Sequence, residues 1–146
     1  MINAVEHYFT IFLRSMHIFL KVSKTLGLQN YEDLTVWQKA MDLVVEVYKI
    51  VKLLPNEEIY ALANQMKRAA VSIPSNIAEG QERGTTKDFV KFLYIAKGSK
   101  GELKTQLMIC VRLKYLTESQ TEVAQGLLSE ISKMLNALIK KLTTVH

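Results

Sequence analysis

The chain has 146 residues, of which 49% are apolar and 23% are charged. This length favours one domain with a single core, and this composition excludes a disordered chain. The formal net charge of +5 permits binding to nucleic acid or another anionic surface without requiring it. No apolar run approaches the length of a bilayer span, so we expect no membrane partner.

The first thirty residues differ from the rest of the chain. Their apolar side chains are interrupted by Arg14, His17 and Lys21, whereas a secretory signal needs an uninterrupted apolar stretch. We therefore interpret residues 1–30 as an N-terminal extension and residues 31–146 as the domain. The extension is either a helix that packs on the domain or upstream sequence included by an early start codon, which the junction-like residues 28–30 favour.

Helical spacing of apolar residues begins after Leu34 and predicts a first helix over residues 36–53. Its inward side chains are predicted to be Trp37, Ala40, Met41, Val44, Val47, Tyr48 and Val51. Pro55 is expected to end this helix, and Asn56 to cap the next one.

A proline lies inside the predicted second helix. The apolar face of this helix is formed by Ile59, Leu62, Met66, Ala69, Ile73 and Ile77. Pro74 has no N–H, so the carbonyl of Ala70 loses its donor and the helix should bend there. The donors that can reach this carbonyl are water, Ser72, Ser75 and Asn76. Gly80 is expected to end the helix in a left-handed conformation.

Two further helices are predicted after a loop over residues 81–86. Thr85 or Thr86 caps the third helix, whose apolar stripe is Phe89, Phe92, Leu93, Ala96, Leu103, Leu107 and Cys110. A capping box of Ser119 and Glu122 starts the fourth helix. Its apolar stripe is Val123, Leu127, Ile131, Met134, Leu135, Leu138 and Leu142. Short connections make consecutive helices antiparallel neighbours, so we predict an all-α, up-down-up-down four-helix bundle.

Some residues are not explained by a single buried stripe on each helix. Glycine weakens a helix interior, so Gly98, Ser99 and Gly101 are expected to let a neighbouring helix approach closely, with a ligand-facing gap as the alternative. Apolar side chains also lie off the predicted stripes, at Leu43, Ile50, Val90, Tyr94, Ile95 and Ile109. These surplus positions indicate a second contact surface and hence a homo-oligomer, unless the N-terminal extension covers them.

No residue set indicates an enzyme, a metal site, a cofactor or a small-molecule substrate. The three histidines lie outside the predicted helices, at His7, His17 and His146. Cys110 is expected to be buried and lacks a base. We assign structural roles to two carboxylates: Glu79 can pair with Arg83, and Glu102 with a basic residue of a neighbouring helix. A single cysteine fits a reducing cytoplasm.

Basic residues on helix faces are the strongest indication of a partner, because lysines at helical spacing can neutralise phosphates with little sequence preference. The candidates for nucleic-acid contact form a stripe and two pairs: Lys97, Lys100 and Lys104; Lys87 and Lys91; Lys67 and Arg68. For any single lysine, a solvated helix face is the simpler interpretation. Beside these lysines, only Tyr94 is expected to offer aromatic stacking.

Four blocks of residues resemble the four-helix bundle family of 23S rRNA intervening-sequence proteins. The blocks are residues 34–40 (LTVWQKA), 65–70 (QMKRAA), 72–80 (SIPSNIAEG) and 92–99 (FLYIAKGS), the last followed by Glu102-Leu103. The structural motif residues within them are Ser72, Ile73, Pro74, Asn76, Glu79, Gly80, Gly98, Ser99 and Glu102. The chain departs from the family pattern at Lys100-Gly101, where a small or apolar pair is more usual.

The resemblance implies a small cytoplasmic bacterial bundle in an RNA-linked setting, and it supplies no catalytic residue. It also links the chain to the accessory variability determinants of diversity-generating retroelements, which form pentameric barrels that bind a reverse transcriptase and RNA. We therefore expect a non-catalytic adaptor that self-associates as a pentamer and binds RNA or an RNA-binding protein such as a reverse transcriptase. The alternative is a structural scaffold that binds another protein and no nucleic acid.

Overall fold

The chain folds into helices. A computed structural model describes residues 4–25 and 30–144, and within these ranges it contains no strand. The α-helices are α1 (Ala4–Thr25), α2 (Thr35–Ile50), α3 (Leu62–Glu82), α4 (Thr86–Arg112) and α5 (Glu118–Thr143). Short 3₁₀ helices are Tyr31–Asp33, Val51–Leu53 and Asn56–Glu58. The predicted all-α class is confirmed, while most of the expected junction at residues 28–30 lies outside the described residues.

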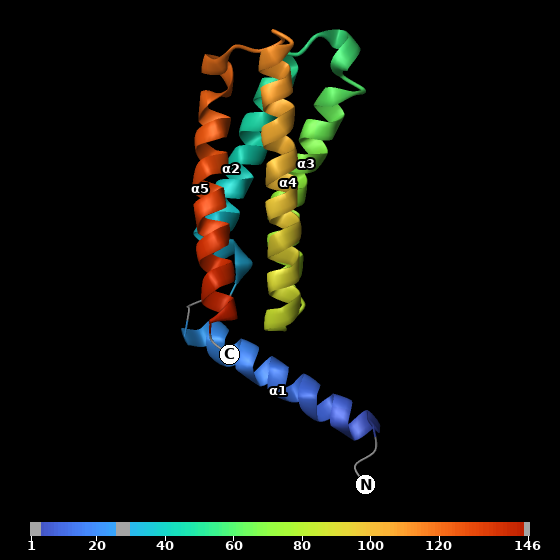
Figure 1. Cartoon of the computed structure of the whole chain (residues 1–146), viewed down its shortest axis with the longest axis vertical. Coiled ribbons are helices and arrows are strands. Elements are labelled where there is room, and N and C mark those ends of the chain that lie inside the picture. The colour runs from blue at the N-terminus through green and yellow to red at the C-terminus, as the bar shows by residue number, and fades with distance from the viewer. Residues whose placement is uncertain (1–3, 26–29, 145–146) are drawn as a thin grey trace.

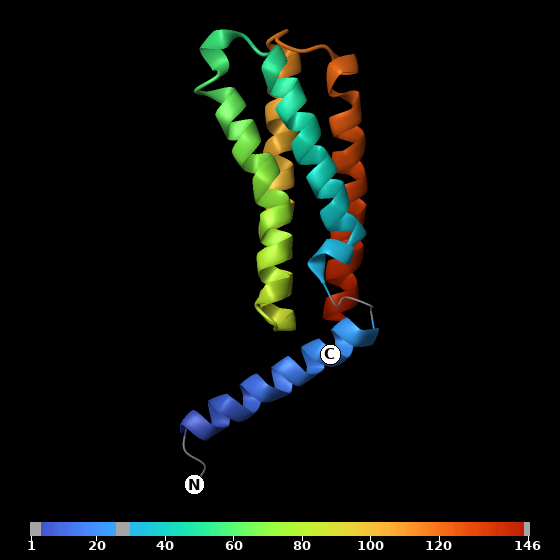
Figure 2. The same cartoon turned by 180° about the vertical axis from the view of Figure 1, so that it is seen from behind.

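Helices α2 to α5, which we call the helical body, lie side by side (Figures 1 and 2). Both α3 and α5 contact α2 and α4, so the groove between α2 and α3 lies opposite the groove between α4 and α5. α1 projects away from one end of the helical body (Figure 1). It touches α4, where the rings of Phe19 and Phe89 pack edge-on with centroids 6.4 Å apart.

The core of the helical body follows alternating three- and four-residue steps, the spacing that keeps one stripe of each helix against its neighbours. On α2 the buried residues are Val36, Ala40, Leu43, Val47 and Ile50. On α4 they include Phe89, Leu93, Ala96, Leu103, Leu107 and Cys110. We call this pattern the core repeat. Not every position of the core repeat holds a large apolar residue or alanine: the exceptions include Gly80 on α3 and Lys100 on α4.

The predicted inward face of α2 is partly wrong. Met41 and Tyr48, predicted to face inward, are 40% and 44% exposed, whereas Leu43 and Ile50, predicted to be surplus, are buried. Both faces of this helix are apolar in sequence. Leu43 and Ile50 continue the core repeat that begins at Val36, whereas Met41 and Tyr48 do not. The repeat therefore decides which face is buried.

The connection between α2 and α3 also differs from the prediction. α2 ends before Pro55 as expected, but Asn56 lies in a 3₁₀ helix and does not cap α3. α3 begins only at Leu62, whose N–H donates to the Glu58 carboxylate at 3.4 Å. Ile59 therefore precedes the helix and is 40% exposed, although it was assigned to the apolar face.

α3 continues through Pro74 and changes direction about midway along its length (Figure 2). The hydroxyl of Ser75 donates to the Val71 carbonyl at 2.8 Å, and the amide of Asn76 donates to the Ser72 carbonyl at 2.7 Å. These bonds support the expected bend, but they involve neighbouring carbonyls and not the one that the proline frees.

The small residues of α4 divide into two groups. Ser99 Oγ lies 2.8 Å from Ser72 Oγ, so at this point α4 does approach α3 closely. In contrast, a Cβ placed on Gly98 or Gly101 meets nothing within 4 Å. Among the described residues of a single chain, no neighbouring helix packs against these two glycines, so the expected close approach there is wrong.

Gly80 does not end α3, which runs on to Glu82. It is buried against α4, and a Cβ placed on it lies only 2.6 Å from the Phe92 Cβ. The left-handed residue of the following turn is Gly84, with φ of 71°. Thr85 then caps α4, as predicted.

The capping box that starts α5 is formed by Thr117 and Gln120, two residues before the predicted Ser119 and Glu122. The Thr117 N–H donates to Gln120 Oε1 at 2.9 Å, and the Gln120 N–H donates to Thr117 Oγ1 at 3.2 Å. Both pairs fit the sequence pattern of such a box, so the pattern alone does not distinguish them. Val123, assigned to the apolar stripe, is 59% exposed because it lies off the core repeat.

Candidate nucleic-acid interface

A hollow of about 150 Å³ lies between α4 and α5. It is lined by Lys100, Lys104, Gln125, Leu128, Ser129 and Ser132, and we call it the basic groove. The Lys100 ammonium donates to Ser132 Oγ at 3.2 Å. None of the described residues that line the groove is acidic.

The position of Lys100 in the core repeat explains why this charge is held in a groove. It falls between Ala96 and Leu103, where the repeat places a side chain toward α5. Burial lowers the pKa of the Lys100 ammonium, and the charges of Lys104 and Lys97 lower it further. A bound anion would oppose both effects, because it supplies the missing opposite charge. A single lysine at a core position can also serve to fix helix register.

The predicted stripe of three lysines is therefore brought together on one surface. Lys97 is half-buried and lies 5.9 Å from the centroid of the Tyr94 ring, which is 54% exposed. Lys104 is exposed. Within the described residues, ion pairs are formed by Lys39, Lys49 and Arg83 but by none of the stripe lysines.

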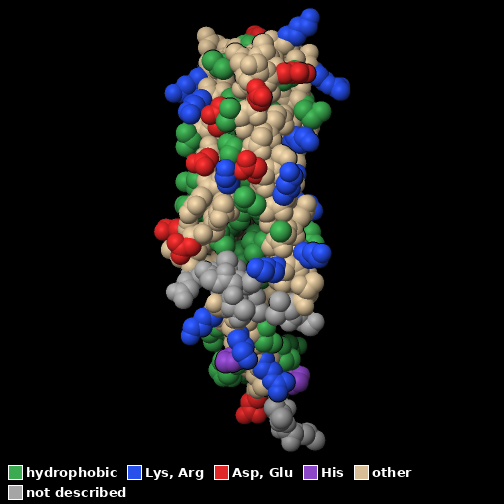
Figure 3. Space-filling model, turned by 90° about the vertical axis from the view of Figure 1, so that its left-hand side faces the viewer, with side chains coloured by type: hydrophobic (Ala, Val, Ile, Leu, Met, Phe, Trp, Pro, Cys, Tyr) green, Lys and Arg blue, Asp and Glu red, His purple; other side chains and the backbone are tan. Residues whose placement is uncertain are grey.

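The second predicted group of basic residues on α4, Lys87 and Lys91, lies apart from this stripe. Lys87 and Lys91 are exposed near the start of the helix, and neither lines the basic groove. The surface on the side of α5 carries charges of both signs. Figure 3, which looks onto that side, shows basic and acidic side chains intermixed. One such pair joins Lys39 to Glu130 at 2.8 Å.

Lys67 and Arg68 belong to a separate hollow of about 410 Å³ between α2 and α3. Its other lining residues are Tyr48, Tyr60 and Asn64, and we call it the aromatic hollow. The sequence patterns did not predict that two tyrosines lie beside these two cations, because Tyr48 was assigned to the core. The core repeat of α2 is the signal that excludes Tyr48 from the interior.

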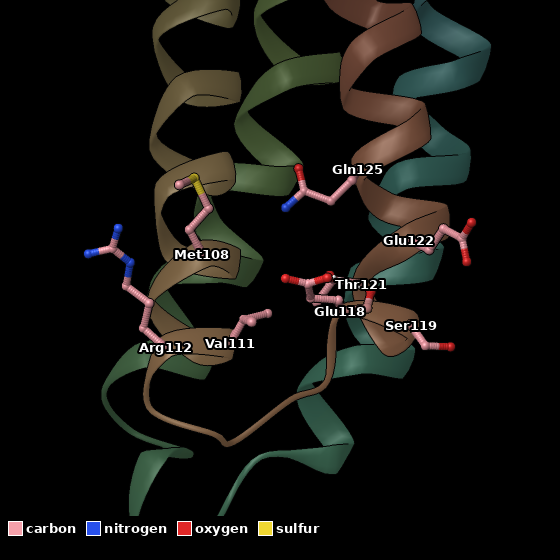
Figure 4. Close-up of a pocket in the computed structure, with 8 residues that line it drawn as sticks. All are labelled: Met108, Val111, Arg112, Glu118, Ser119, Thr121, Glu122 and Gln125. Atoms are coloured by element: carbon pink, nitrogen blue, oxygen red, sulfur yellow. Dashed lines mark hydrogen bonds between the residues drawn. The ribbon is translucent and has the colours of Figure 1, made fainter.

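A third hollow, of about 700 Å³, opens between α4 and α5 near their connection. Figure 4 shows Gln125 and Val111 directed into the space between the two helices, while Arg112 points away from it. Glu118 and Glu122 also line this hollow, so two carboxylates accompany its one guanidinium group. This mixture does not favour a phosphate.

The side chains that sequence reasoning weighed for chemistry are engaged in structural contacts. Glu79 accepts from Arg83 at 2.6 Å, as predicted, but Glu102 accepts from Gln106 of its own helix at 3.1 Å and not from a basic residue of another helix. Cys110 is buried, as predicted, and burial raises the pKa of its thiol to about 11.

Residues 4–25 and 30–144 contain no cluster of three or more His, Cys, Asp and Glu side chains that could hold a metal ion. His146 lies outside these ranges, and His7 and His17 are exposed on α1. Within the same ranges, no helix combines the length and the apolar character that crossing a membrane requires.

Comparison with known proteins agrees with the resemblance seen in the helix motifs. The model of the family described as 23S rRNA-intervening sequence protein matches residues 32–137. A crystal structure of a protein of unknown function from the S23 ribosomal protein family of Bacteroides thetaiotaomicron is similar, with a TM-score of 0.67 and 30% sequence identity. The alignment covers 73% of this chain and 99% of that one. No curated protein matches the chain.

Proposed function

Because the chain belongs to the family of 23S rRNA-intervening sequence proteins, we propose that it is a non-catalytic adaptor that binds RNA through the basic groove. In this proposal α2–α5 form an antiparallel up-down-up-down four-helix bundle, and residues 1–30 are an appended segment. The protein acts in the cytoplasm, and a reverse transcriptase is one candidate partner.

The observation that carries the proposal is the set of three lysine charges on one side of α4, none of which forms an ion pair among the described residues. Lys100 is partly desolvated there, and its ammonium donates to a neutral hydroxyl, that of Ser132. Ser129 and Ser132 can donate hydrogen bonds to a phosphate held by the lysines. A groove with these donors suits the sugar–phosphate backbone and offers little for reading a base sequence.

Charge reversal of Lys97, Lys100 and Lys104 together is expected to weaken RNA binding and its dependence on salt. Loss of three phosphate contacts should reduce the slope of log Kobs against log salt concentration by about 2–3. Affinity for a fluorescent RNA, measured by anisotropy over a series of salt concentrations, gives this slope.

The matched control reverses Lys133, Lys140 and Lys141, three exposed lysines of α5, and so changes the net charge equally. If both triple variants lose the same affinity and slope, the basic groove has no special role. If neither variant changes RNA binding, or if binding resists salt, the scaffold alternative is favoured.

We further propose that the adaptor self-associates through the outer side of α4, as a pentamer by analogy with the related retroelement proteins. Tyr94, Ile95 and Ile109 are exposed there, and Gly98 presents no side chain. A flat strip flanked by apolar side chains lets a helix of a second copy approach closely.

Ile95→Glu combined with Ile109→Glu is expected to leave the fold intact and yield monomers. Val123→Glu, at an exposed apolar residue of α5, is the control and should leave assembly unchanged. Sedimentation equilibrium measures the mass of each variant. A wild-type chain that sediments as a monomer would contradict self-association, and equal masses for the wild type and the double variant would place the interface elsewhere.

A further inference from the structure

We infer that the aromatic hollow between α2 and α3 binds an unpaired RNA base, with Tyr60 as the stacking surface and cationic side chains at the adjoining phosphate. This inference rests on the proposed RNA-binding function and adds the class of RNA, which is single-stranded. The hollow lies on the side of the helical body opposite the basic groove, so the two sites can be tested separately.

The first support is the exposure and alignment of the aromatic residues. Tyr60 is 88% exposed in the turn that precedes α3, and Tyr48 of α2 is 44% exposed. Asn64 and Arg68 lie one turn apart on α3 and line the same hollow as Tyr60. Exposed aromatic rings beside a row of cations are the combination that binds single-stranded nucleic acid without sequence preference.

The second support is the arrangement of charge. Lys67 Nζ lies 5.5 Å from the centroid of the Tyr48 ring, a cation–π contact that holds the ammonium beside the hollow. Among the described residues, neither Lys67 nor Arg68 is part of an ion pair. A phosphate next to a stacked base would therefore be the counter-charge for both.

The third support is the size and chemistry of the remaining space. A volume of about 410 Å³ lies within the range of small-molecule sites, so one nucleotide can be accommodated. Asn64 carries both a donor and an acceptor, which can pair with a base edge that is not engaged in a duplex. The basic groove has no aromatic lining residue, and the hollow of Figure 4 has two carboxylates, so neither offers the same combination.

The test compares the binding of a short oligoadenylate with that of an RNA duplex of equal length, using the full chain. Tyr60→Leu removes the stacking ring but keeps an apolar side chain. It is expected to weaken oligoadenylate binding roughly 5- to 150-fold, the range for one stacked base, and to leave duplex binding unchanged. Tyr8→Leu, at a tyrosine of α1 that is 74% exposed, is the matched control and should change neither.

The outcomes separate this inference from the proposed function. If Tyr60→Leu binds oligoadenylate as the wild type does, while reversal of Lys97, Lys100 and Lys104 weakens both RNAs, base stacking is overturned and the basic groove stands. If the wild-type chain binds neither RNA, both proposals fail. If AMP alone binds as tightly as the oligoadenylate, the hollow is a free-nucleotide site and the assignment to RNA is overturned. The inference is supported if Tyr60→Leu loses affinity for the oligoadenylate but not for the duplex, and Tyr8→Leu loses affinity for neither.

Discussion

Phe89→Ala is expected to lower the free energy of unfolding by about 3–5 kcal/mol, the range for deleting a fully buried phenylalanine ring. Phe89 is 0% exposed. Its ring packs against Phe19 of α1, and its backbone and ring lie within 3.4 Å of the space that a side chain at Gly80 would fill. One substitution therefore weakens the contacts of α4 with both α3 and α1. Urea denaturation followed by circular dichroism measures the loss.

Two variants test whether the loss comes from this buried ring. Phe89→Leu retains most of the volume and is expected to cost less than about 1.5 kcal/mol. Phe12→Ala, at a ring of α1 that is 53% exposed, should stay within about 0.5 kcal/mol of the wild type. A loss from Phe12→Ala as large as that from Phe89→Ala would mean that α1 is packed elsewhere, contrary to the structure.

Gly80→Ala is expected to lower the free energy of unfolding by about 1–3 kcal/mol, although alanine is the better helix former. The added Cβ would lie 2.6 Å from Phe92 Cβ and 3.2 Å from Phe89 Cδ2. Phe92 Cβ is fixed to the backbone of α4, so relief requires α3 and α4 to move apart. Chemical denaturation, with α-helix content as a check on the folded state, measures the cost.

Gly126→Ala, inside α5 and away from the proposed contact between copies, is the matched control for Gly80→Ala. It introduces the same methyl group into a helix interior, but at a site where nothing lies within 4 Å. Helix propensity then acts alone, and stability should rise by about 0.5–1 kcal/mol. Stabilisation by both substitutions would show that α3 and α4 are not as close as described. The pair therefore separates the packing of two helices from the intrinsic preference of one.

Much of the fold could be predicted because the signals that produce it are local. Apolar residues recur at helical spacing, and Pro55 and Thr85 mark an end and a start that the structure reproduces. Choices between equivalent local patterns could not be made this way. On α2, two faces are apolar, and only packing against the other helices selects Leu43 over Met41. Likewise, two overlapping sequence patterns at the start of α5 fit a capping box, and only the structure shows that Thr117 and Gln120 form it.

The candidate sites show the same division. The lysine stripe was predicted from its spacing along α4, since helical neighbours are fixed by sequence. The hydroxyls of Ser129 and Ser132 belong to α5, and their place beside Lys100 depends on how two helices pack. Tyr48 and Tyr60 come from α2 and the turn before α3, so their shared hollow is likewise tertiary. Gly80 was assigned to a helix end because its contact with Phe92 is invisible in the sequence.

Because Cys110 is buried, the rate at which its thiol is alkylated can report how fast the helices around it open. It is the only cysteine of the chain, its Sγ contacts the Met66 sulfur at 3.7 Å, and ionisation is disfavoured while it stays enclosed. An aqueous alkylating reagent can reach it only when the surrounding helices separate. At saturating reagent, the labelling rate therefore equals the opening rate, which can be read by mass spectrometry on the unaltered chain.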